Sequence, residues 1–118
     1  MQILNEKSGE AVIFKLNGRL DSNTSSEFGQ KIRQAIETGS RYLIFDFADL
    51  EYLSSAGLRE FLNTAKALKK MDGRLVLCTM PDYIREIIEV AGFDSILPIV
   101  ATVDDALKKI RTDVSESR

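Results

Sequence analysis

Two adjacent serines stand where an apolar run gives way to a helical pattern. Residues 54–58 read SSAGL, and from Leu58 onward apolar residues recur at helical spacing. The start of a helix has unpaired N–H donors and a partial positive charge, and serine is a favoured capping residue there. The same donors would stabilise a phosphate carried by a serine. Ser54 and Ser55 therefore have two interpretations, as a helix cap or as a phosphorylation site.

Gly57 lies just inside the expected helix, where glycine costs about 1 kcal/mol relative to alanine. A glycine at this point permits the close approach of another surface. That surface is either a partner protein or the sheet of the protein itself. If a partner approaches, a bulky residue at position 57 should block binding and leave the fold intact.

The residue content excludes several other chemistries. The chain has no histidine, which excludes histidine bases, histidine triads and histidine metal sites. Its single cysteine, Cys78, excludes an internal disulfide and a cysteine-pair zinc site, and its place in an apolar run predicts a core residue. The glycine motifs of dinucleotide, nucleoside triphosphate and α/β-hydrolase sites are absent. We therefore expect a protein that is not an enzyme and that needs no cofactor and no metal.

Length and charge restrict the class of protein further. The chain has 118 residues, which suits one domain, and its content of 44% hydrophobic and 29% charged residues is that of a globular protein. The net charge of −2 and the pI of about 5.2 argue against binding nucleic acid through its phosphates. No apolar run reaches the roughly 20 residues of a transmembrane helix, and residues 1–10 are too polar for a signal peptide. We expect a cytoplasmic protein without membrane contact, and a lone cysteine suits that reducing compartment.

The elements that must position the serines follow from the periodicity of the chain. It predicts strands at residues 3–4, 11–17, 42–45, 74–79 and 96–100, and helices at 24–38, 55–71, 81–91 and 102–111. Residues 24–27 read TSSE, the pattern of a capping box. Pro98 cannot donate to a neighbouring strand, so the last strand is expected at an edge of the sheet.

Strands that alternate with helices predict an α/β domain with a mostly parallel sheet, and the first hairpin makes the sheet mixed. The fold class is a single α/β domain at residues 1–111, with four or five strands covered by about four helices. Residues 112–118 have little apolar content and are expected to form a flexible polar tail.

Two segments together resemble a known family. Residues 18–21 read GRLD and residues 46–58 read DFADLEYLSSAGL. In these motifs, and in element order over residues 3–111, the chain resembles the STAS domain family and, more narrowly, the bacterial anti-sigma factor antagonists. The resemblance implies a STAS-type fold and a binding switch. The unphosphorylated antagonist binds an anti-sigma factor of the GHKL serine kinase type and frees a sigma factor. The kinase ends the binding by phosphorylating one serine, and a PP2C-type phosphatase restores it.

The resemblance also implies the site residues. In the family motif D-S-[ST]-G-L the modified serine stands two residues before the glycine, which is Ser55 here. The family's acid after the second strand corresponds to Asp21. The expected partner-binding residues, which should cluster on the surface, are Asp21, Ser54, Ser55, Gly57 and Arg59. The chain has Ser54 where the family has an acid and Ala56 where it has a small hydroxyl residue, so Ser54 is the alternative phosphate acceptor.

Two other interpretations of the chain stay open at this point. One is a STAS adaptor subunit of a transport or signalling complex, with an ATPase or a scaffold as its partner. The other is a receiver domain phosphorylated at Asp46, although such a domain has a lysine after its last strand and residues 101–102 are Ala-Thr. The lysines of the second helix are expected on a solvated face, where they could also meet an acidic partner; they are Lys66, Lys69 and Lys70.

Overall fold

The computed structural model describes residues 1–117, which form five strands and four helices in the predicted order. The elements are β1 (Gln2–Ser8), β2 (Ala11–Leu20), α1 (Ser25–Glu37), β3 (Tyr42–Leu53), α2 (Ser55–Lys69), β4 (Arg74–Cys78), α3 (Asp82–Val90), β5 (Ile99–Val100) and α4 (Val103–Ser117).

All five strands form one mixed sheet in the order β1-β2-β3-β4-β5. The hairpin pair β1 and β2 is antiparallel, and every other neighbouring pair is parallel. The predicted fold class is therefore confirmed, and β5 lies at an edge as expected, although Pro98 precedes this strand and does not belong to it. Strand β5 has only two residues, but the Pro98 carbonyl still accepts a hydrogen bond from the Leu77 amide, at 2.9 Å.

Alternation along the central strands divides the core between the two faces of the sheet. Phe45 and Leu77 point into the larger cluster, which α1, α2 and α3 cover. Ile44 and Val76 point to the other face, where Ala106 and Ile110 of α4 cover them. Both strands are therefore buried on both faces, which explains their nearly continuous apolar sequence.

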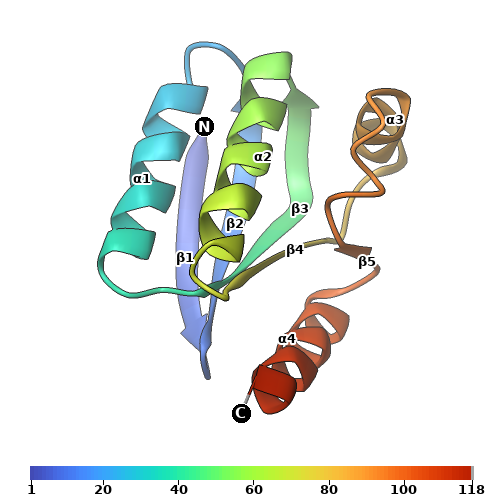
Figure 1. The fold of residues 1–118 in the computed structure, drawn as a ribbon. Coiled ribbons are helices and arrows are strands. Elements are labelled where there is room, and N and C mark those ends of the chain that lie inside the picture. Colours follow the sequence, from blue (N-terminus) through green and yellow to red (C-terminus); the bar gives the residue numbers. More distant parts are fainter. Residues whose placement is uncertain (118) are drawn as a thin grey trace.

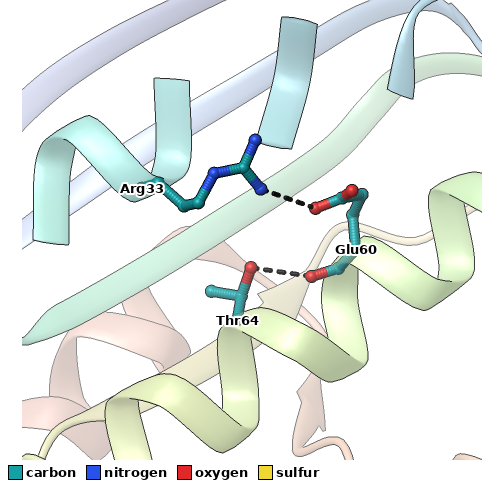
Figure 2. Close-up of polar contacts among 3 residues, drawn as sticks. All are labelled: Arg33, Glu60 and Thr64. Atoms are coloured by element: carbon teal, nitrogen blue, oxygen red, sulfur yellow. Dashed lines mark hydrogen bonds and ion pairs between the residues drawn. The ribbon is translucent and has the colours of Figure 1, made fainter. Parts of the chain in front are cut away.

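The helices α1 and α2 lie side by side across the sheet (Figure 1). Gly29 of α1 leaves room for the Glu60 side chain of α2, because a Cβ at position 29 would lie 2.6 Å from its carboxylate. Figure 2 shows Arg33 reaching Glu60 from α1, with 3.8 Å between nitrogen and oxygen, while the Thr64 hydroxyl donates to the Glu60 carbonyl. The ion pair is partly exposed and contributes below about 1 kcal/mol to the stability of the fold.

The structure corrects two expectations about the ends of helices. The capping box at residues 24–27 does not form, because the Thr24 hydroxyl donates to the Arg19 carbonyl instead of capping α1. Helix α4 does not end at residue 111 but continues to Ser117, and Val114 packs against the core cluster beneath it. The expected polar tail therefore begins within a helix, and its last residue, 118, lies outside the described residues.

Candidate functional site

The candidate site lies at the edge of the sheet where the parallel strands β2 and β3 end. Leu20 and Leu53 are paired across the two strands, and the Ser54 amide donates to the Leu20 carbonyl at 2.9 Å. Asp21 and Ser54 are the next residues of their respective segments. The fold therefore brings together two motifs that are more than thirty residues apart in the sequence.

The two serines have different roles. Ser54 has extended backbone angles, is half-buried and is the N-cap of α2, because its Oγ accepts a hydrogen bond from the Gly57 amide at 3.2 Å. Ser55 is the first residue of the helix, and its side chain is exposed, as expected. Its hydroxyl has no hydrogen-bond partner within residues 1–117. Ser54 therefore caps the N-terminus of α2, and the hydroxyl of Ser55 is the one accessible from solvent.

Gly57 is buried, and the expectation that it belongs to an exposed partner surface is wrong. A Cβ at position 57 would lie 2.7 Å from Leu20 Cγ and 2.9 Å from Leu53 Cδ1, which is closer than such atoms pack. The surface that approaches this glycine is the protein's own sheet. The missing side chain allows the first turn of α2 to lie against the strand ends, and this contact places Ser55 at the edge.

Arg59 is exposed and follows Ser55 by four residues on α2. Residues at this spacing share one face of a helix. The guanidinium of Arg59 is therefore within reach of a group carried by Ser55. Of the five residues expected at the partner surface, Ser55 and Arg59 are exposed, Asp21 and Ser54 are half-buried, and Gly57 is not on the surface.

Asp21 holds the turn between β2 and α1. Its Oδ1 accepts hydrogen bonds from the Asn23 amide at 2.9 Å and the Thr24 amide at 3.1 Å. The bond from the Thr24 amide is the main cause that lowers the pKa of Asp21 from its ordinary value of 3.8, because it favours the charged form. Asp21 therefore has a structural role in addition to its expected place at the partner surface.

A pH titration should detect this role of Asp21. Because its folded pKa lies below the unfolded one, the charged carboxylate stabilises the fold above pH about 4, and this contribution disappears as the pH falls through the folded pKa. Urea unfolding of the wild type and of Asp21→Asn should therefore show a stability difference that is constant near neutral pH and shrinks below pH about 4. A difference that does not change with pH would contradict this role.

Two aromatic residues beside the site, Tyr52 and Tyr83, are not among the predicted site residues. Strand β3 continues to Leu53, beyond the predicted strand at 42–45, and its Tyr52 lies exposed opposite Arg19, whose guanidinium is 4.3 Å from the ring centroid. Tyr83 of α3 donates from its hydroxyl to the Leu50 carbonyl at 2.7 Å. The alternation of buried Leu53 with exposed Tyr52 is the available sequence signal, but it is too short to separate a strand from a loop.

Asp46 does not have the exposure of a phosphate acceptor. It lies within β3 with 5% of its surface exposed, and its Oδ1 accepts hydrogen bonds from the Thr79 hydroxyl and the Ala48 amide. Thr79 has a φ of 52°, in the left-handed region that β-branched residues rarely adopt. Asp46 thus connects β3 to the end of β4 through its hydrogen bond with Thr79. The buried carboxylate argues against the interpretation as a receiver domain, which needs an accessible aspartate at this position.

Cys78 is a core residue, as expected. It is fully buried, and burial raises the pKa of its thiol to about 11. At pH 8 only about one molecule in a thousand would then carry a thiolate. We predict that Ellman's reagent at pH 8 leaves the native protein unmodified and reacts with one thiol per chain in urea. Complete reaction of the native protein within minutes would contradict this prediction.

The described residues hold no group of three or more acidic or cysteine side chains arranged to bind a metal ion. Over the same residues, no helix is long and apolar enough to span a bilayer.

The fold and the site together define a class of protein: a small α/β domain that presents an exposed serine at the start of a helix, beside an acidic turn. The chain belongs to the STAS domain family, because the model of that family matches residues 2–106. The resemblance seen in the sequence is confirmed.

Individual relatives agree with this assignment. The chain is 32% identical over 112 residues to BtrV of Bordetella bronchiseptica, whose name assigns it provisionally to the anti-sigma factor antagonists, and the match covers 95% of this chain and 97% of BtrV. It is 27% identical over 85 residues to the anti-sigma-B factor antagonist of Staphylococcus aureus, covering 72% and 79%.

Among solved structures, the anti-sigma factor antagonist SpoIIAA in its unphosphorylated form superposes with a TM-score of 0.81 at 24% identity, covering 94% of this chain and 97% of SpoIIAA. The phosphorylated form from Bacillus superposes with a TM-score of 0.73 at 23% identity, covering 92% and 99%. This chain and SpoIIAA therefore share a fold.

Proposed function

We propose that this protein is an anti-sigma factor antagonist controlled by phosphorylation of Ser55. In its unphosphorylated form it binds an anti-sigma factor of the GHKL serine kinase type, and this binding frees a sigma factor in the cytoplasm. Transfer of the γ-phosphate of ATP to Ser55 by that kinase ends the binding, and a PP2C-type phosphatase restores it. The protein acts by binding and catalyses no reaction itself.

The different environments of the two serines carry the proposal. Ser54 is half-buried and its Oγ is engaged by the Gly57 amide, whereas the Ser55 hydroxyl is exposed and without a partner among the described residues. A kinase needs an accessible hydroxyl, so Ser55 is the acceptor. The names of the relatives in Bordetella bronchiseptica and Staphylococcus aureus support an anti-sigma factor as the partner. The existence of SpoIIAA in a phosphorylated form supports the proposal that this fold can carry a phosphate.

A phosphate on Ser55 would be accommodated within the domain. It would lie at the N-terminus of α2, where the unpaired amides and the helix dipole contribute about 0.3–1 kcal/mol toward an anion. Arg59, one turn further along, can pair with it. Phosphorylation should therefore change what the surface binds without unfolding the protein. The proposed partner surface comprises Asp21, Ser54, Ser55 and Arg59, together with the neighbouring side chains of Arg19 and Tyr52.

The experiment that tests this function locates the phosphate. The protein is used to capture its kinase from an extract of its own host, and the purified kinase is incubated with ATP and each of three chains: wild type, Ser55→Ala and Ser54→Ala. Mass spectrometry should find phosphate on Ser55 of the wild type and of Ser54→Ala, and none on Ser55→Ala. Phosphate on Ser54 of the wild type would sink the assignment. Capture of an ATPase or a scaffold in place of a kinase would favour the adaptor interpretation.

A further inference from the structure

A groove of about 630 Å³ lies between α2 and the segment that connects α3 to β5. The lining residues that matter here are Leu62, Ala65, Lys66, Lys69, Phe93 and Ile96. The groove is at the C-terminal part of α2. Ser55 starts the same helix, and Lys66 lies eleven positions further along, which is about 16 Å along a helix axis.

The floor of the groove is apolar and partly uncovered. Leu62, Ala65 and Phe93 pack on the main core cluster but remain half-buried. Ile96 lies beside them and is 60% exposed. The floor therefore offers three half-buried apolar side chains and one exposed apolar side chain to a ligand.

The rim of the groove is basic. Lys66 and Lys69 are exposed, and neither forms an ion pair with a residue of the described chain. Arg74 also lines the groove, but its guanidinium pairs with Asp113 at 2.7 Å. The lining contains no aspartate or glutamate, although the protein as a whole has a net charge of −2. The charged side chains of the lining are therefore all basic, which makes the lining complementary to an acidic ligand.

We infer that this groove binds an acidic amphipathic helix of a partner protein and is a second docking surface, separate from the one at Ser55. From Leu62 to Lys69 the groove wall spans two helical turns, about 10 Å. This length suits a docked helix whose apolar residues recur at i, i+3 or i+4, and i+7 and whose flanks carry carboxylates. Because the two surfaces lie at different ends of α2, the protein can hold this helix whether or not Ser55 is phosphorylated.

The test is a titration of the isotope-labelled full chain with a synthetic helical peptide, followed by NMR. The peptide has about 15 residues, with leucines at the stated spacing and glutamates on both flanks. Addition of the peptide should shift the signals of Leu62, Phe93 and Ile96 and leave Ser55 unchanged. Binding should weaken about tenfold in the Lys66→Glu/Lys69→Glu variant, which reverses both rim charges, and should be the same in wild type and Ser55→Asp.

Two control variants separate the loss of the rim charges from the other effects of the Lys66→Glu/Lys69→Glu substitutions, namely the change in net charge and the new anions at the end of α2. Lys31→Glu/Lys108→Glu makes the same change in net charge at exposed positions of α1 and α4 and should bind the peptide like the wild type. Lys66→Gln/Lys69→Gln removes the rim charges without placing anions at the C-terminus of α2, so it keeps the helix intact and should bind at an intermediate level.

The inference is overturned if the peptide does not bind, if a scrambled peptide binds equally well, or if the rim variants bind like the wild type. Dodecanoate serves as a probe for a small anionic amphiphile, and shifts of the groove signals with dodecanoate but not with the peptide would also overturn it. None of these outcomes depends on an anti-sigma factor, so the proposal at Ser55 stands or fails separately.

Discussion

Phosphorylated at Ser55, the protein should bind its anti-sigma factor about 100-fold more weakly than in its unphosphorylated form. The phosphate carries about −1.5 to −2 charges at pH 7. If the partner places a carboxylate about 6 Å away, two unit charges at an effective dielectric near 20 repel by roughly 3 kcal/mol. At 1.4 kcal/mol per factor of ten, this corresponds to a loss of about 100-fold. The added volume at an exposed helix start acts in the same direction.

Variants at the two serines make this prediction specific. Ser55→Ala should bind like the wild type and resist the kinase, because its hydroxyl supports nothing else in the fold. Ser55→Asp should lose only part of the affinity, since it has one charge and a smaller group. Ser54→Ala is the matched control for the phosphate acceptor: it removes the cap of α2 and costs about 1 kcal/mol in stability, but it should still be phosphorylated on Ser55 and bind more weakly when it is. Isothermal titration against the purified anti-sigma factor measures each affinity, and equal binding of phosphorylated and unphosphorylated protein would refute the mechanism.

Replacing Gly57 by valine should destabilise the protein by about 1–2 kcal/mol, through the fold and not through the partner. The first added carbon, Cβ, would already lie 2.7 Å from Leu20 Cγ and 2.9 Å from Leu53 Cδ1. Both leucine side chains are buried in the core. Overpacking a well-filled core costs typically 1–3 kcal/mol. The helix propensity gained by removing a glycine, below 1 kcal/mol, offsets only part of this.

Urea unfolding followed by circular dichroism measures the effect at Gly57. Ala56→Val is the control, because it places the same valine side chain in the same helical turn at a half-buried position, and it should change stability by less than about 1 kcal/mol. Gly57→Ala should fall between the two. A Gly57→Val protein as stable as the wild type would mean that α2 can move away from the strand ends, and the reason given for this glycine would then be wrong.

The sequence by itself determined the elements and the candidate serines. Apolar periodicity placed every strand and helix in order, because burial of one face or both imposes a period that the residue types reveal. The edge position of the last strand followed from Pro98, which lacks an N–H. The GRLD and SSAGL segments were sufficient to find the family, since both are local patterns.

Only the tertiary structure decided where each candidate site residue lies and what it contacts. Whether Gly57 faces a partner or the sheet depends on Leu20, which lies thirty-seven positions earlier in the chain and contacts it only after the strands pair. The choice between the serines likewise depends on geometry, because either could cap the helix until the backbone places Ser54 in the extended conformation and aims its Oγ at the Gly57 amide. Side-chain contacts between segments distant in sequence leave no periodic signal, so their consequences appear only when the sheet has formed.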